Sequence, residues 1–220
     1  MSNYCIKYGR DARVKYISHL DFVRMFHRAV RRAGLPFMFS QGFNPHPIMT
    51  VAVPLSVGVT AEGEYMRVGF DTNADGAEIM QILNSALPEG FFVSAAMRAE
   101  GKEPDFNLIE HAEYIIDAEA EMPEDFSAQP FLDLTELVVM KKTKSGEKET
   151  DIRPLIYELE KTEPTSGNLG LRMVIAAGNR ATLKPETVIA AVNKYLPEVK
   201  IGFFSVHRRA LLDIQDHELL

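Results

Sequence analysis

The feature that most constrains the fold of this chain is a short motif that occurs twice. Leu87-Pro88-Glu89 leads into Gly90-Phe91-Phe92, and Leu196-Pro197-Glu198 is followed, three residues later, by Gly202-Phe203-Phe204. Each copy comes after a segment with helical apolar periodicity, and the two copies are 109 residues apart. Because 109 residues is about the length of one small domain, the motif predicts two similar halves.

The first half reads as strand, helix, strand, strand, helix, strand. Ser18 and Asp21 have capping-box spacing at the start of the first helix, and Gly34 ends it before Pro36. Asp75 and Glu78 are expected to cap the second helix. Alternating or apolar runs predict strands at 4–17 (a strand or a hairpin), 37–40, 48–53, 63–70 and 91–97. This order is the ferredoxin-like arrangement, an antiparallel sheet with two helices on one face.

The second half repeats the pattern less regularly, after a charged linker expected at 100–105. Pro123 and Pro130 allow only a short or distorted first helix, and a hairpin tip is expected at 144–148. A second helix is expected from Pro185 to Leu196. We therefore predict an α+β fold of two tandem ferredoxin-like (βαββαβ) halves: residues 1–105, with a basic helix and a Gly/Pro loop, and residues 106–220, with a degenerate first helix.

Composition excludes several classes of protein. The chain has 220 residues, 46% of them hydrophobic, but no apolar run near the roughly 18 residues that span a bilayer, and no signal segment. Its single cysteine, Cys5, excludes an internal disulfide and a cysteine-rich iron-sulfur or zinc site. We therefore expect a cytoplasmic protein without membrane contact, cofactor or resident metal.

Charge is distributed unevenly along the chain. Residues 1–50 contain eight Lys and Arg residues against two Asp residues, a net charge of +6, whereas the whole chain carries −7. Residues 51–220 therefore carry −13. This asymmetry suggests that the N-terminal part faces a polyanion, although exposed helices are often basic without any ligand.

The first helix separates its apolar and basic residues onto two faces. On a 3.6-residue period, Phe22, Phe26 and Val30 share the inward face. The opposite face carries four arginines: Arg24, Arg28, Arg31 and Arg32. These side chains either contact phosphates or form the solvated side of an amphipathic helix.

The stiff Gly/Pro loop, Ser40–Pro47, follows this helix. Gly42 permits a turn that other residues resist, while Pro45 and Pro47 fix the backbone at two places. A loop shaped in this way suits the presentation of side chains, here those of Gln41, Phe43, Asn44 and His46. The alternative is a rigid corner with no binding role.

Five motifs together resemble one known family. They are Ser18-His19-Leu20-Asp21, residues 28–36, Gly42-Phe43-Asn44-Pro45-His46-Pro47, residues 54–59 with Gly63-Glu64-Tyr65, and Asp151-Ile152-Arg153-Pro154. They are similar to the bacterial radical-SAM-linked domain of unknown function, found as separate small proteins and as the C-terminal part of cobalamin-binding radical SAM proteins. The resemblance implies a radical SAM enzyme as partner. This chain lacks the three-cysteine motif of such an enzyme, so it cannot perform that chemistry alone.

The leading hypothesis is a non-catalytic accessory module that binds RNA and assists a radical SAM partner in modifying tRNA or rRNA. The basic N-terminal segment and the open faces of ferredoxin-like sheets favour this hypothesis. The net negative charge of the whole chain and the absence of the aromatic RNP pattern of RRM domains argue against it. The expected RNA contacts are Lys15, Arg24, Arg28, Arg31, Arg32, Gln41, Phe43, Asn44 and His46.

Two other functions are compatible with the same residues. One is a protein-binding adaptor that docks on the radical SAM enzyme without touching RNA. The other is a metal-independent endoribonuclease in which His19 or His46 acts as general base near Lys15 or an arginine.

A possible second site comprises His19, Asp21, Asp151 and Arg153. Asp151 and Arg153 would point to the same side of a strand, where they pair or jointly present charge. A surface salt bridge is the favoured explanation of this pair. A metal held by His19, Asp21 and His46 is disfavoured, because residues two apart on a helix do not share a face.

Overall fold

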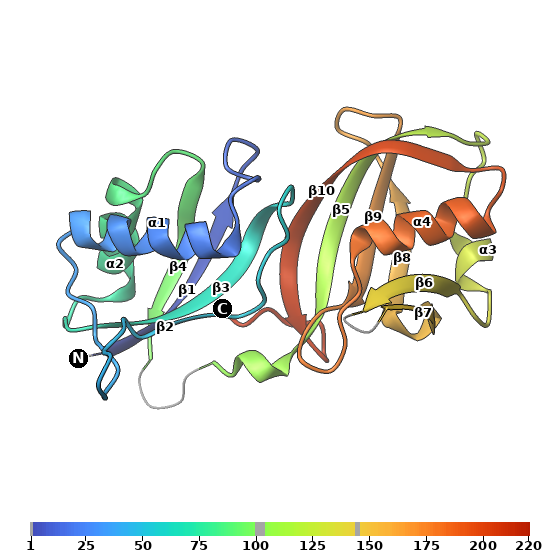
Figure 1. Ribbon diagram of the computed structural model, residues 1–220. Coiled ribbons are helices and arrows are strands. Elements are labelled where there is room, and N and C mark those ends of the chain that lie inside the picture. Colours follow the sequence, from blue (N-terminus) through green and yellow to red (C-terminus); the bar gives the residue numbers. More distant parts are fainter. Residues whose placement is uncertain (1, 100–103, 144–145) are drawn as a thin grey trace. The chain divides into compact units, whose positions relative to one another are not determined.

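The computed structural model describes residues 2–99, 104–143 and 146–220 (Figure 1). The described chain has a mixed α+β fold, mostly antiparallel sheet, with four α-helices in the described residues. It divides into two compact units. Unit 1 comprises Met1–Leu108 and His217–Leu220, and unit 2 comprises Ile109–Asp216. The linker expected at 100–105 lies largely outside the described residues, and the division falls just after it.

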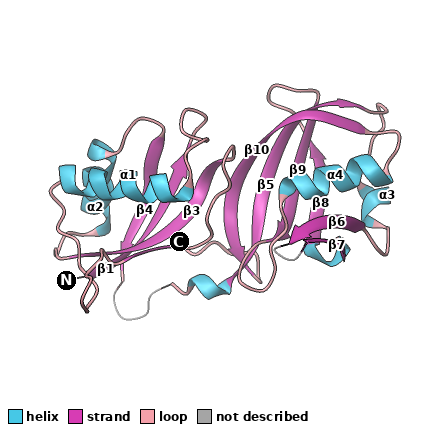
Figure 2. Cartoon of the chain, viewed as in Figure 1, coloured by secondary structure: helices cyan, strands magenta, loops and turns pink. Residues whose placement is uncertain are grey.

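Unit 1 contains an antiparallel sheet with two helices packed on one face (Figure 2). The strands are β1 (Ser2–Arg10), β2 (Met49–Val51), β3 (Thr60–Phe70) and β4 (Phe91–Arg98), in the order β4-β1-β3-β2. The helices are α1 (His19–Arg32) and α2 (Gly76–Ala86). Tyr4, Ile6 and Tyr8 point from β1 into a core that includes Phe26 of α1 and Leu83 of α2. Removing this apolar surface from water is the main force that holds the helices on the sheet.

The ends of both helices follow the chemistry expected from the sequence. The Ser18 hydroxyl accepts the backbone N–H of Asp21 at 3.2 Å, and Gly34 lies just past α1 with φ of +72°. At α2 the Glu78 N–H donates to the Asp75 carboxylate, and the Asp75 N–H donates to the Glu78 carboxylate, each at 2.9 Å. These reciprocal bonds satisfy N–H groups that have no partner inside the helix.

The strand or hairpin expected at 4–17 is confirmed only as far as Arg10, and the strand expected at 37–40 is wrong. β1 ends at Arg10, and residues 11–17 form turns that begin where the Asp11 N–H donates to Gly90 O at 2.9 Å. Residues 37–40 make only isolated bridges, Phe37 with Phe70 and Phe39 with Pro47. The apolar side chains of both segments pack against the core from loops, which alternation alone cannot distinguish from a strand.

Buried Arg10 explains why the chain turns away at the end of β1. Its side chain is 4% exposed, and its guanidinium donates to three backbone carbonyls. Nε donates to Val59 O at 2.9 Å, Nη1 to Ile17 O at 3.0 Å, and Nη2 to Ser56 O. One side chain therefore fixes two loops, residues 11–18 and 52–59.

The main strands of unit 2 are also antiparallel. They are β5 (Ile109–Glu121), β8 (Ile156–Thr162), β9 (Leu169–Ala176) and β10 (Lys200–Asp213), in the order β10-β5-β9-β8. The helices are α4 (Pro185–Tyr195) and the four-residue α3 (Gln129–Leu132), as short as its prolines predict. β6 (Val138–Thr143) and β7 (Gly146–Asp151) form a separate hairpin. The short 3-10 segments are η1 (Phe106–Leu108), in unit 1, and η2 (Arg153–Leu155).

Each unit contains the same kind of hydrogen-bonded link between its own last helix and its own last strand. Asn84 of α2 exchanges two hydrogen bonds with the backbone of Val93, at 2.9 and 2.8 Å. Asn193 of α4 makes the same pair with Ile201, at 2.9 and 2.7 Å. The asparagines are 109 residues apart, the spacing of the repeated motif. The spacing of the repeated motif thus also relates two asparagines that lie outside the motif and make the same contact.

The last residues of the described chain return to unit 1. The Glu218 carboxylate accepts the Tyr65 hydroxyl at 3.1 Å and pairs with the Lys7 ammonium. Burial first, and the nearby Glu218 charge second, raise the pKa of the Tyr65 phenol above its usual range. No helix in the described residues is long and apolar enough to cross a bilayer.

Candidate functional site

A small pocket in unit 1 brings together residues from α1 and from the chain that follows the Gly/Pro loop. His19, Val23 and His27 line one side, because a spacing of four residues keeps them on one strip of the helix. The pocket has a volume of about 240 Å³, and the rest of its lining comprises His46, Pro47, Met49, Val51 and Pro54. The pocket thus has apolar walls and three imidazoles, and it unites His19 with His46.

His27 is the lining residue that sequence reasoning missed. Its Nε2 is buried and has no hydrogen-bond partner in the described structure, and its ring meets Phe37 edge-on at 5.2 Å between centroids. Burial, and secondarily the charge of Arg31, lower the pKa of the His27 imidazole. The eight-residue spacing from His19 on one helix is the signal that could have identified it.

The lowered pKa of His27 makes a prediction for acid stability. An unfolded histidine titrates near pH 6.5, so below about that pH the unfolded chain takes up a proton that folded His27 resists. Stability should therefore fall as the pH drops below 6.5, down to the lower pKa of the folded state. His27→Phe removes this contribution, and its melting temperature should fall less than that of the wild type between about pH 7.5 and 5.5. Equal falls in the two proteins would contradict the assignment.

The four arginines of α1 are exposed, but they are not equivalent. Arg24 Nη1 lies 3.3 Å from the Asp21 carboxylate, and Arg32 Nη2 donates to Ala86 O at 2.7 Å, at the end of α2. Arg28 and Arg31 have no such partner among the described residues. A helix with 3.6 residues per turn places Arg24 and Arg31 on the strip next to His27, which borders the pocket.

The Gly/Pro loop is a closed corner held by Ser40 and His46. The Ser40 N–H donates to His46 O at 2.9 Å, the His46 N–H donates to Ser40 Oγ at 3.1 Å, and the same hydroxyl lies 2.8 Å from His46 Nδ1. Gly42 has φ of +127°, in the region that favours glycine. The corner leaves Gln41, Phe43, Asn44 and Pro45 exposed, with the Phe43 ring entirely in solvent, while Pro47 turns toward the pocket.

Lys15 lies in the loop that Arg10 supports. Its ammonium is 5.3 Å from the centroid of the neighbouring Tyr16 ring, and its carbonyl accepts the Gly58 N–H at 2.7 Å. Arg10 also borders a narrow space with His19 and Leu55. Arg10, which holds this loop in place, therefore also lies beside His19, the first residue of α1 in the pocket.

The residues of the suggested second site divide between the units. Asp21 does not line the pocket, since its carboxylate accepts the Ser18 hydroxyl at 2.7 Å. That bond and Arg24 lower the pKa of Asp21. In the described chain no cluster of three His, Cys, Asp or Glu side chains is arranged to hold a metal ion.

Asp151 and Arg153, in unit 2, do not share a strand as expected. Asp151 ends β7 and accepts the backbone N–H of Leu137 at 2.8 Å and of Arg153 at 2.9 Å, bonds that lower its pKa. Arg153 begins η2, because Pro154 favours a helical turn over a strand, and its guanidinium donates to the carbonyls of Leu132 and Ile156, each at 2.9 Å. The side chains of Asp151 and Arg153 therefore each bond to backbone groups and hold the nearby chain in place.

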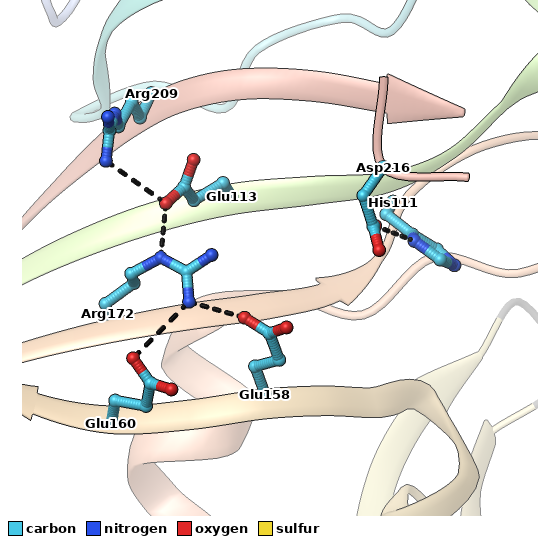
Figure 3. A network of polar contacts seen from close by, with 7 residues as sticks. All are labelled: His111, Glu113, Glu158, Glu160, Arg172, Arg209 and Asp216. Atoms are coloured by element: carbon cyan, nitrogen blue, oxygen red, sulfur yellow. Dashed lines mark hydrogen bonds and ion pairs between the residues drawn. The ribbon is translucent and has the colours of Figure 1, made fainter. Parts of the chain in front are cut away.

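Unit 2 also carries a network of ion pairs that the sequence did not suggest (Figure 3). The Arg172 guanidinium pairs with Glu113 and Glu158, and lies 3.5 Å from Glu160. The Glu113 carboxylate also lies 3.3 Å from Arg209. Burial alone would lower the pKa of Arg172, but its bonds to the carboxylates raise it. The network ties together β8, β9, β5 and β10, and it leaves no charged group of its own unpaired.

Comparison with known proteins identifies a family. A family model described as an uncharacterized protein conserved in bacteria (DUF2344) matches residues 3–185. No curated protein matches the chain. Among solved structures, it is similar to an unknown protein from Galdieria sulphuraria, with 17% identity over 94% of this chain and 98% of that chain; the TM-score of 0.26 is too low to support any argument. Since the family model covers most of its length, this chain belongs to the DUF2344 family of uncharacterized proteins conserved in bacteria.

Proposed function

We propose that this protein is a non-catalytic accessory module that binds RNA through α1 and the Gly/Pro loop of unit 1. The observation that carries the proposal is the imidazole-lined pocket that joins α1, which bears the exposed arginines, to the Gly/Pro loop, which bears the exposed Phe43 ring. Arginine charge attracts phosphates, and exposed aromatic rings stack on unpaired bases. The contacts we assign are Lys15, Arg24, Arg28, Arg31, Arg32, Gln41, Phe43, Asn44 and His46.

The partner we propose is a radical SAM enzyme that modifies tRNA or rRNA in the cytoplasm. This part of the proposal comes from the resemblance of Ser18-His19-Leu20-Asp21 and the Gly/Pro loop to the radical-SAM-linked domain. In this arrangement the present chain holds the RNA and needs no cofactor, while the partner supplies the reaction.

We also infer that both units are ferredoxin-like halves derived from one ancestor. In both units the strands are ordered last, first, third, second, if β5, β8, β9 and β10 are counted as the four strands of unit 2. The asparagine links at Asn84 and Asn193 lie at corresponding places. On this view the β6–β7 hairpin is an insertion beside a reduced first helix.

The RNA proposal is tested by the salt dependence of binding. A fluorescein-labelled single-stranded RNA is titrated with the full chain at several salt concentrations, and log affinity is plotted against log salt. Replacing Arg24, Arg28 and Arg31 with glutamine should flatten the slope by about two units, since each phosphate contact contributes about 0.7 on single strands. Glutamine preserves helix propensity, so the fold should remain intact.

A charge-matched variant separates a local site from general attraction. Arg180, Lys184 and Lys200 are exposed residues of unit 2, and their replacement with glutamine removes the same charge. That variant should keep the wild-type slope; equal flattening in both variants would contradict a site on α1. A wild type that binds no RNA at about 50 mM salt, where attraction is strong, would favour the adaptor function. Shortened RNA after incubation would favour the ribonuclease, because His19 and His46 line one pocket.

A further inference from the structure

We propose that the pocket between α1 and the chain after the Gly/Pro loop takes one unpaired nucleobase. The inference rests on the proposed RNA function and assigns a subsite within it. Three properties of the pocket carry it: its size, the chemistry of its lining and the position of the arginines.

The size of the pocket suits one ring system. Its volume of about 240 Å³ lies below the roughly 300 to 1,000 Å³ of pockets that enclose drug-sized ligands. A whole nucleotide would therefore extend beyond it, with the base inside and the sugar and phosphate at the rim. Single-stranded RNA is commonly recognised through bases that are splayed out in this way.

The lining suits a flat heterocycle with polar edges. Val23, Met49 and Val51 provide apolar surface, as the faces of a base require. No carboxylate, lysine or arginine lines the pocket, so neither a phosphate nor a divalent cation would find a charged partner inside. The polar groups are imidazoles, which donate or accept hydrogen bonds according to tautomer.

Two imidazoles are prepared to meet the edge of a base. Ser40 occupies Nδ1 of His46, which leaves Nε2 for a ligand. His27 also lines the pocket, and its Nε2 is buried without a hydrogen-bond partner among the described residues. An unpaired buried nitrogen is unfavourable, so a ligand that bonds it gains an interaction the free protein lacks.

The arginines place the phosphate at the rim. Arg24 and Arg31 lie three residues before and four residues after His27, one helical turn to either side. Both are exposed, and Arg31 is near enough to influence the His27 imidazole. A nucleotide whose base lies against His27 would therefore have cationic side chains within reach of its phosphate.

The test compares ligands that share a phosphate and differ in the base. Imidazole signals of the full chain are followed by NMR during titration with adenosine 5′-monophosphate, uridine 5′-monophosphate and ribose 5-phosphate. At least one nucleotide should shift His19, His27 and His46 saturably. Ribose 5-phosphate should bind about 5- to 150-fold more weakly, the fold-change expected for one stacked base. Equal affinities for all three would overturn the proposal.

Variants separate this proposal from RNA binding itself. His27→Phe keeps an aromatic wall but removes the nitrogens, and Val23→Phe fills the pocket. Both should lose the preference for nucleotide over ribose 5-phosphate, while the RNA salt slope stays at the wild-type value. Lys184→Gln, an exposed position of unit 2 outside the proposed site, should keep the preference. Should the pocket variants retain it, the base lies elsewhere even if RNA binds; if the nucleotide binds but RNA does not, only the RNA function fails.

Discussion

Arg10→Leu should lower the free energy of unfolding by about 3 to 5 kcal/mol, because it leaves three backbone carbonyls without their donor. The guanidinium is 4% exposed and supplies donors to the carbonyls of Val59, Ile17 and Ser56. Leucine fills part of the space but donates nothing. Each buried acceptor left unpaired costs about 1 to 3 kcal/mol, less where water enters.

Urea unfolding followed by circular dichroism measures this effect, and Arg13→Leu is the matched control. The Arg13 side chain is 55% exposed and pairs with Asp11 and Glu89 at the surface, so its loss should cost less than about 1 kcal/mol. Arg10→Lys should lie between the two, because an ammonium cannot span three acceptors. If the Arg10 and Arg13 variants lose equal stability, the carbonyl contacts do not hold the two loops.

Gly76→Ala should destabilise the protein by about 1 to 3 kcal/mol, although alanine is the better helix former. Gly76 is the first residue of α2, and a Cβ there would lie 1.9 Å from the carbonyl oxygen of Ala96 in β4. That oxygen belongs to a paired strand and cannot rotate away as a side chain can. Either α2 or β4 must therefore move.

Gly42→Ala provides the comparison for Gly76→Ala, with melting temperature as the measurement. Gly42 has φ of +127° and no atom within 4 Å of a built Cβ, so its substitution tests backbone strain without a clash. A cost of about 1 to 3 kcal/mol is expected from strain alone, confined to the loop. Gly76→Ala should also weaken the packing of α2 on β4, visible as faster amide exchange in both. A stabilised Gly76→Ala protein would show that α2 is free to shift.

Local chemistry explains which parts of the fold the sequence could predict. The caps at Ser18, Asp75 and Glu78 involve residues three apart, so their bonds can be recognised without knowing the rest of the structure. The prolines near residue 130 limit α3 in the same local way. The boundaries of α1, α2 and α4 were therefore predictable to within a residue or two.

Long-range contacts explain what the sequence could not predict. In the sequence Arg10 cannot be distinguished from an exposed charged residue, because the carbonyls that it bonds come from two separate loops. His27 looks like part of the helix surface until Pro47 and Pro54 enclose the pocket beside it. The pairing of Glu113 with Arg172 likewise depends on which strands are neighbours. The loop residues Gln41, Phe43 and Asn44 were correctly expected to be exposed because glycine and proline fix their corner locally.

The return of His217–Leu220 to unit 1 makes unit 2 an inserted domain. Once unit 1 is folded, the contacts of Glu218 with Lys7 and Tyr65 require the 108 residues Ile109–Asp216 to form a closed loop, which in a flexible chain would cost about 4 kcal/mol of entropy. Unit 2 removes most of this cost when it folds, because its register sets Ile109 directly opposite Asp213. Folding of unit 2 thereby brings residues 217–220 close to unit 1. The contacts of Glu218 with unit 1 are therefore expected to form only when unit 2 is folded, although residues 217–220 are not part of unit 2.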